Sequence, residues 1–262
     1  MSTILAAVRD RRFLLSARPW RAVAYLLTTA VVVAPTAAVA WLLALPWLVA
    51  ATDLRDGRLP DAPVVLLMIL GAGLVAVLGP LVAVPLAALE RRRLAVLDDR
   101  PVRSAHRPAP ADPVSWLRVR YTEAATWREV LYALLVSLVV PVGYAALALA
   151  AVVVAGFLVS PLVAGTGTVH WQLGPFDVGG TGDAVPLALL GLVLLVPLVY
   201  LTSLVAAGQA AVARALLGDQ AGTALREVAR SRARLVDAFE AERRRIQRDL
   251  HDGAQHQLTS LT

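Results

Sequence analysis

Four long runs of residues without a single charge dominate this chain of 262 residues. They cover residues 22–51, 64–89, 130–164 and 184–213. Each run exceeds the roughly 20 residues that an α-helix needs to cross about 30 Å of hydrocarbon. An open strand would leave its backbone N–H and C=O groups unpaired in lipid, whereas a helix pairs them internally. The pattern therefore predicts an all-α integral membrane protein with four transmembrane helices.

The composition supports this class and excludes others. Hydrophobic residues make up 58% of the chain and charged residues 17%, whereas soluble domains are about half apolar and a quarter charged. The chain has no Cys, which excludes disulfides and Cys-based metal sites. All 25 basic residues are Arg, and the net charge is +6. We attribute this charge to cytoplasmic loops rather than to nucleic-acid binding, and we expect no direct nucleic-acid partner.

The distribution of Arg predicts the orientation in the membrane. Arg is dense in residues 1–21, in the segment 90–129 and after residue 213, whereas the loop 165–183 has none. In the loop 52–63, acidic residues offset the Arg. The positive-inside rule then puts both termini and the segment 90–129 in the cytoplasm. We expect a multi-pass protein of a bacterial inner (plasma) membrane.

An internal repeat divides the four spans into two hairpins. Trp20-Arg21-x-x-x-Tyr25 returns as Trp127-Arg128-x-x-x-Tyr132, and Val-Pro-Leu at 84–86 returns at 196–198. The copies would be parallel repeats about an axis along the membrane normal. Chance similarity between Ala-, Leu- and Val-rich helices is the alternative. We interpret the Trp-Arg-x-x-x-Tyr signature as an anchor at the cytoplasmic interface.

The chain thus divides into a cytoplasmic N-terminus (1–21), a four-span membrane domain (22–213) and a C-terminal segment (214–262). Within the cytoplasmic loop 90–129, residues 114–126 form either a helix on the membrane surface or a solvated linker. Prolines within or next to the spans are expected to kink them. These are Pro35, Pro46, Pro80, Pro85, Pro141, Pro161 and Pro197.

The C-terminal segment predicts one long cytoplasmic dimerisation helix. Residues 221–261 contain no Pro. Apolar residues recur at spacings of three, four and seven, interrupted by Arg232 and Glu242, which is typical of a coiled-coil seam. We therefore expect a homodimer through this helix. The seam residues are Leu225, Val228, Leu235, Phe239, Ile246 and Leu250.

A histidine beside a carboxylate lies near the end of this predicted helix. His251 follows the seam residue Leu250, and Asp252 comes next. A nucleophilic imidazole requires a neighbouring group that holds the ring and takes its proton. Arg248 lies one turn earlier and could pair with an acidic side chain or with phosphate.

This segment resembles the phosphoacceptor box of sensor histidine kinases that signal to response regulators with helix-turn-helix output domains. The four-span region, about residues 15–215, resembles the sensor domain that precedes some of these kinases. The resemblance implies that His251 is the phosphoacceptor, Asp252 the general base and His256 the phosphatase position, where Gln is commoner. The matching residues are Glu242, Arg243, Arg245, Ile246, Arg248, Asp249, Leu250, His251 and Asp252.

The resemblance also implies ATP and Mg as cofactors and a cognate response regulator as partner. No motif for an ATP-binding domain precedes Thr262. We therefore expect the chain alone to be inactive with ATP. The alternative is a naturally truncated, non-catalytic membrane protein that dimerises with full-length kinases or inhibits them.

Two further readings are weaker. A transporter would suit parallel repeats, but the four apolar runs carry no acidic residue, Arg or His for an ion pathway. A metal site is not expected, because His251 and His256 are five residues apart and do not share a helix face. His106 and His170 are expected to be solvated loop residues. The stimulus would act in the bilayer, at a shallow outer pocket or through a partner protein.

Overall fold

The computed structural model describes two units of the chain separately. It describes residues 13–97, 102–108, 110–164, 171–173, 176–178 and 181–219, and in the C-terminal segment 222, 228–229, 231–236, 238–239 and 242–243. The first unit is Met1–Gly218 and the second is Asp219–Thr262.

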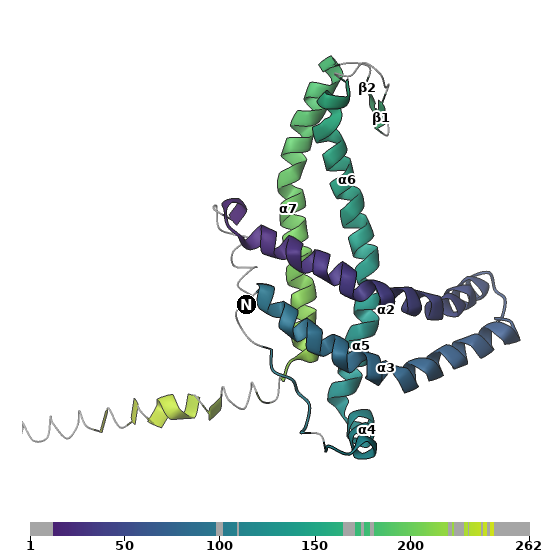
Figure 1. Cartoon of the computed structure of the whole chain (residues 1–262), viewed down its shortest axis with the longest axis vertical. Helices are drawn as coiled ribbons and strands as arrows, with labels where there is room; N and C mark the ends of the chain where they lie inside the picture. Colours follow the sequence, from purple (N-terminus) through teal and green to yellow (C-terminus); the bar gives the residue numbers. More distant parts are fainter. Residues whose placement is uncertain are drawn as a thin grey trace, which may run out of the picture. The chain divides into compact units, whose positions relative to one another are not determined.

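The first unit is built almost entirely from helices (Figure 1). Four stretches are long and apolar enough to cross a membrane, which confirms the prediction of a helical membrane protein: Arg18–Arg55, Ala62–Leu97, Ala124–Ala164 and Ala184–Leu217. The elements in chain order are η1 (Phe13–Leu15), α2 (Arg18–Arg55), α3 (Ala62–Leu97), α4 (Pro113–Thr122), α5 (Ala124–Leu138), α6 (Val140–Ala164), β1 (Trp171–Leu173), β2 (Phe176–Val178) and α7 (Thr181–Leu217).

The helices extend beyond the apolar runs that predicted them. α3 continues past Leu89 to Leu97, so the first part of the expected loop 90–129 is helical. Of the two alternatives for residues 114–126, the structure shows a helix, α4, which ends at Thr122. Asp112 caps α4 by accepting a hydrogen bond from the Ser115 N–H at 2.9 Å. Helix continuation past a charged residue is expected wherever the charge finds a partner inside the bundle.

The prolines rarely interrupt the helices. α2 runs through Pro35 and Pro46, and α3 runs through Pro80 and Pro85. The third span is divided at Val139, where the N–H still donates to the Leu135 carbonyl at 2.9 Å. This division lies next to Pro141, which has no N–H to continue the helical hydrogen-bond ladder.

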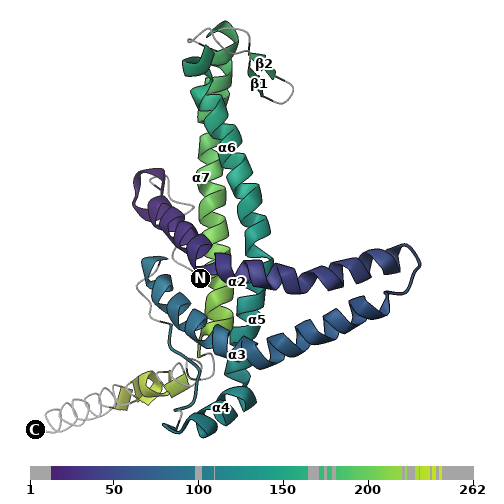
Figure 2. The same cartoon turned by 45° about the vertical axis from the view of Figure 1, so that its right-hand side comes forward.

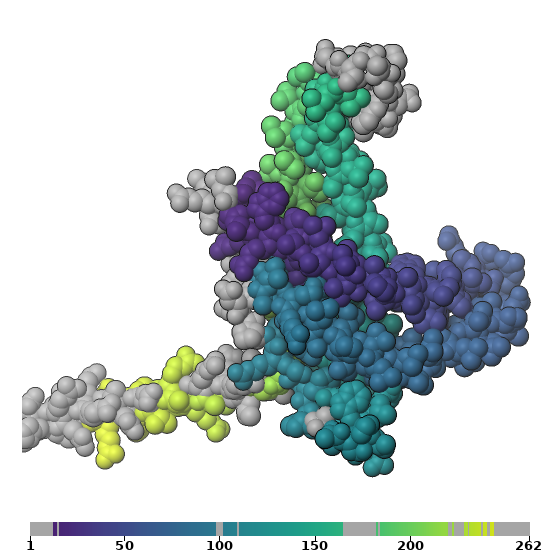
Figure 3. Space-filling model, in the orientation of Figure 1, coloured from purple at the N-terminus to yellow at the C-terminus, as the bar shows by residue number. Residues whose placement is uncertain are grey.

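One main core joins the hairpins. α2 packs on α3 and α6 packs on α7, and α6 and α7 lie side by side in both ribbon views (Figures 1 and 2). α2 and α3 also lie against each other in the space-filling view (Figure 3). α7 contributes small residues to the core, which lets backbones approach closely. The fully or almost fully buried members include Ala22, Tyr25, Ala87, Leu94, Tyr132, Ala206, Ala207, Ala210, Ala213 and Leu217.

A second, smaller core lies between α6 and α7. It is formed by Phe157, Ala184 and Leu187. At Gly191 a side chain would not fit, because a Cβ there would lie 2.9 Å from the Cβ of Phe157. The glycine therefore allows α6 and α7 to approach closely.

A short hairpin between α6 and α7 departs from the all-α expectation. β1 pairs with β2 in antiparallel register, with Trp171 opposite Val178 and Leu173 opposite Phe176. The hairpin lies within the segment 165–183, which the sequence predicted only as a loop between two spans. β-Branched and aromatic residues favour such pairing.

In the second unit the described positions between 222 and 243 are helical. Three seam residues among them, Val228, Leu235 and Phe239, are 52%, 68% and 80% exposed. Their apolar surface is therefore open in a single chain.

The tightness of the main core can be tested at Ala87, which is fully buried on α3. Ala87→Leu adds methyl and methylene groups to a filled site, and we expect it to lower the free energy of unfolding by about 1–3 kcal/mol. Ala76→Leu is the matched control, because Ala76 is exposed on the same helix. Unfolding in SDS titrations, followed by tryptophan fluorescence, measures both. Equal stability of the two variants would contradict the described core.

Candidate functional site

A network of polar side chains lies inside the main core. Tyr25 and Thr29 come from α2, Glu90 and Arg93 from α3, and Gln209 from α7, and all five residues are buried. Tyr25 lies near the start of one apolar run, Glu90 directly follows another and Gln209 lies near the end of a third, so the network lies at the ends of the runs. It replaces water for groups that would otherwise be buried without hydrogen bonds.

The centre of this polar network is an ion pair within one helix. Arg93 Nη1 lies 2.6 Å from Glu90 Oε2, and the two side chains are 9% and 4% exposed. The Tyr25 hydroxyl donates to the other oxygen of Glu90. Arg93 Nη2 donates to the Tyr25 carbonyl at 2.8 Å and to the Thr29 hydroxyl. Both charges are therefore paired and also hydrogen-bonded, which is the condition for tolerating a buried ion pair.

The polar network continues to the last span. Gln209 Nε2 donates to Thr29 Oγ1 at 3.3 Å, and the Tyr144 hydroxyl of α6 donates to Gln209 Oε1 at 2.8 Å. Four long helices, α2, α3, α6 and α7, are thus linked by one chain of hydrogen bonds. A displacement of one helix has to break or rearrange bonds to the others.

A second group of charges lies beside the first, and we name it the histidine cluster: His106, Glu123, Glu129, Arg91 and Arg120. His106 Nδ1 lies 2.8 Å from Glu123 Oε2, and His106 Nε2 lies 2.9 Å from Glu129 Oε2. Arg91 pairs with Glu129 at 2.7 Å, and Arg120 pairs with Glu123 at 3.0 Å. His106 was expected to be solvated, but its side chain is only 9% exposed.

The cluster shifts the pKa values of its members outside the spans. The interaction with Glu129 is the largest cause that raises the pKa of His106 above 6.5, and it outweighs burial, which acts in the opposite direction. Burial alone would raise the pKa of Glu123, but hydrogen bonds from the Arg107 N–H and from His106 lower it below its ordinary value.

The histidine cluster contacts the end of the last span. We name residues 102–108 the strap, because His106 ties this extended segment to α5. Ser104 of the strap forms a bridge with Gly218, directly after α7. Arg91 Nη1 also lies 3.5 Å from the Leu217 carbonyl. The strap and α3 therefore both contact the point from which the C-terminal segment continues.

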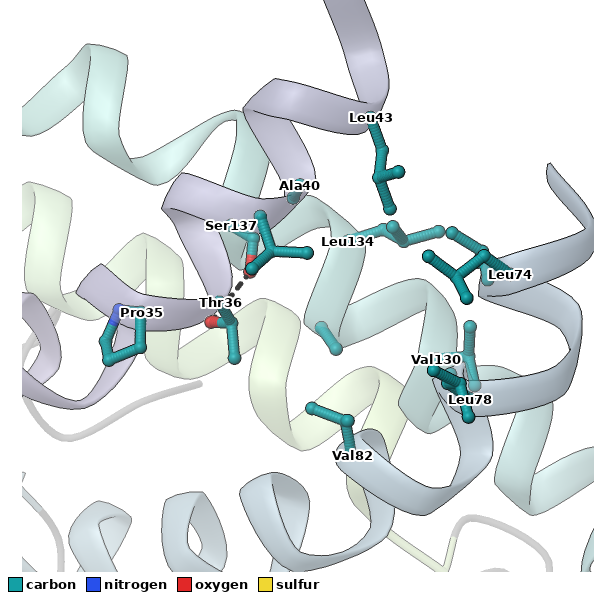
Figure 4. A pocket seen from close by; sticks show the side chains of 14 residues that line it. Pro35, Thr36, Ala40, Leu43, Leu74, Leu78, Val82, Val130, Leu134 and Ser137 are labelled. Atoms are coloured by element: carbon teal, nitrogen blue, oxygen red, sulfur yellow. Dashed lines mark hydrogen bonds between the residues drawn. The ribbon is translucent and has the colours of Figure 1, made fainter. Parts of the chain in front are cut away.

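An apolar cavity of about 340 Å³ opens between α2, α3 and α5 (Figure 4). Its walls are almost entirely hydrocarbon, and the Ser137 hydroxyl donates to Thr36 Oγ1 at 3.1 Å across its polar edge. Val130 lines the cavity and directly follows Glu129 of the histidine cluster. The cavity can accept an uncharged, apolar molecule from the bilayer. A second apolar cavity, of about 720 Å³, lies between α2, α6 and α7.

Sequence reasoning missed both charged groups. Glu90 directly follows the uncharged run 64–89, and Glu129 directly precedes the run 130–164. Both were therefore placed in the loop between the two spans. Trp20 and Trp127 are 75% and 41% exposed, as an interfacial anchor requires, but Tyr25 is buried in the core. The spacing of Glu90 and Arg93 on a continuing helix was the available signal.

The residues predicted from the sequence to do chemistry lie outside the described residues. These are Arg248, His251, Asp252 and His256. Among the described residues, no group of three or more His, Cys, Asp or Glu is arranged to hold a metal ion.

The fold and the composition define a multi-pass membrane protein. A family model described as "Putative sensor" matches residues 62–217, from the start of α3 to the end of α7. The chain belongs to this family, which is typical of the sensor domains of histidine kinases. No curated protein and no solved structure matches the chain.

The buried ion pair can be tested with two neighbouring arginines of α3. Arg93→Leu leaves the Glu90 carboxylate buried without its partner, and we expect a loss of about 3–5 kcal/mol in the free energy of unfolding. Arg92→Leu is the control, because Arg92 is exposed, and we expect a change within about 0.5 kcal/mol. SDS unfolding titrations measure both. A small effect at Arg93 would show that the pair does not hold the helices together.

Proposed function

We propose that this protein is the membrane sensor and phosphoacceptor part of a two-component histidine kinase. The observation that carries the proposal is the run Glu242 to Asp252, which follows a sensor domain of a family typical of such kinases. The sensor domain by itself supports only a role as a membrane sensor. The kinase activity depends on the C-terminal residues.

In this proposal His251 is the nucleophile. One imidazole nitrogen attacks the γ-phosphorus of ATP, the bond to the β–γ bridging oxygen breaks, and ADP leaves. Asp252 accepts the proton from the ring, and Arg248 stabilises the phosphate or a neighbouring carboxylate. ATP and Mg are bound by a separate ATP-binding domain. The phosphoryl group then passes to an Asp of the response regulator, and His256 aligns water for its later removal.

Dimerisation through the C-terminal helix fits this scheme. The exposed seam residues Val228, Leu235 and Phe239 support it, because a partner helix would cover them. In the proposed orientation both termini lie on the cytoplasmic side of a bacterial plasma membrane. There the C-terminal segment meets ATP and the regulator.

Signal transfer follows from the connectivity. α7 ends at Leu217, and the chain continues from there toward His251. The membrane helices would have two packings, and a stimulus that binds one packing better shifts the population toward it. The polar network and the histidine cluster would limit the helices to a few distinct packings. Their hydrogen bonds and ion pairs are either kept or replaced by bonds to other partners.

The phosphoacceptor role can be tested with purified membranes. The full chain, mixed with Mg, labelled ATP and a matching ATP-binding domain, is expected to gain an acid-labile phosphoryl group. His251→Gln should abolish the label, because glutamine has no nucleophilic nitrogen.

His256→Gln is the control and should still be labelled, because the proposed role of this position is in dephosphorylation. Labelling that survives His251→Gln would refute the assignment. Association with a full-length kinase without any label would instead favour a non-catalytic interaction protein.

A further inference from the structure

His106 has an acceptor at each of its two ring nitrogens. Nδ1 lies 2.8 Å from Glu123 Oε2, and Nε2 lies 2.9 Å from Glu129 Oε2. A neutral imidazole has only one N–H, so its other nitrogen would present a lone pair to a carboxylate oxygen. Nδ1 is hydrogen-bonded to Glu123, whereas Nε2 makes a close ion-pair contact with Glu129 Oε2 that lacks hydrogen-bond geometry. Only the imidazolium places a positive charge beside both carboxylates, so the geometry favours the protonated ring.

We propose that His106, Glu123 and Glu129 form a proton-binding site through which the sensor domain responds to pH. The proposal deepens the proposed function, since its output rests on the sensor being coupled to His251. The ligand is the proton of the compartment that faces the strap, which the Arg distribution predicts to be the cytoplasm.

Among the described residues, charged groups on α3, on α4, on α5 and between α4 and α5 act on this equilibrium. Glu129 of α5 and Glu123, between α4 and α5, favour the imidazolium, whereas Arg120 of α4 opposes it. Arg91 of α3 faces the site through Glu129, at 2.7 Å. The carboxylates prevail, and the pKa of His106 is raised above 6.5. The protonated contact is therefore complete below pH 6.5, and it is lost as pH rises through the raised pKa.

Loss of the proton affects one element more than the others. Glu129 keeps Arg91 and Glu123 keeps Arg120, so the helices retain their ion pairs. The Arg107 N–H of the strap also keeps its hydrogen bond to Glu123. The strap loses one of the two contacts by which His106 is attached. Because Ser104 of the strap is paired with Gly218, the loosening reaches the end of α7. Proton loss can thus alter the contact between the strap and Gly218, directly after α7, without unfolding the helical bundle.

Direct titration tests proton binding. The full chain, labelled with ¹³C-histidine and reconstituted in nanodiscs, has four histidine signals. The signal that disappears in His106→Gln is expected to titrate above pH 6.5. In Glu129→Gln it should move to a lower pKa, because the main stabilising charge is gone. A His106 signal that titrates at or below pH 6.5 would overturn the proposal. This titration is made on the wild-type chain, and His106→Gln serves only to assign the signal.

Hydrogen exchange tests the consequence for the strap. After correction for intrinsic exchange rates, peptides covering residues 102–108 should lose protection several-fold as pH rises through the His106 pKa. His106→Gln is the control, and its protection should not follow that pH change. The same pH dependence in both chains would overturn the coupling of the proton to the strap.

Phosphorylation in the same pH series separates the two proposals. If no chain is labelled at any pH, the kinase proposal fails, while the titration and exchange results stand by themselves. If His251 is labelled equally in the wild type and in His106→Gln throughout the series, the signalling role of the proton is refuted. A pH-dependent label that His106→Gln makes independent of pH is the expected result.

Discussion

The guanidinium of Arg93 and the carboxylate of Glu90 are buried side by side, and the packing of α3 against α2 depends on this pair. In a low-dielectric interior each charge is tolerable only while the other is present and its remaining hydrogen-bonding atoms are occupied. Tyr25 and Thr29 of α2 supply partners for Glu90 Oε1 and Arg93 Nη2, and among the side-chain nitrogen and oxygen atoms of the pair Arg93 Nε alone is left without a hydrogen bond. The first hairpin is therefore fixed by polar chemistry, in a region where hydrophobic burial between membrane helices contributes little.

The same constraint reaches the second hairpin through Gln209. Its amide bonds Thr29 on one side and accepts from Tyr144 on the other. The small residues of α7, such as Ala206 and Ala210, bring its backbone close enough for this contact. Close apolar packing and the polar network thus depend on each other. A core of this kind has few intermediate arrangements, which suits the two packings proposed for the sensor.

The sequence was sufficient for the spans and insufficient for the site. An uncharged run of over twenty residues permits only a helix, so the membrane class followed directly. Glu90 and Glu129 were assigned to a loop because each apolar run was ended at the first charged residue. Hydropathy cannot show that a charged residue has a partner 38 residues away, as Arg91 has in Glu129. The burial of His106 depends on side chains from α3, α4 and α5, so no pattern in the sequence near His106 predicts it. Tyr25 was recognised as part of a repeat but placed at the interface.

The position of the charged groups along the helices also bears on how a membrane sensor works. Val130 contacts the apolar cavity, and the preceding residue, Glu129, holds His106. Both residues are on α5, and a rigid helix cannot move one of them without the other. A change in the packing of α5 against α2 and α3 therefore also changes the attachment of the strap. The strap in turn contacts Gly218, where α7 has ended. Changes within the bilayer and changes of charge at its edge therefore converge on the same few residues at the end of the last span.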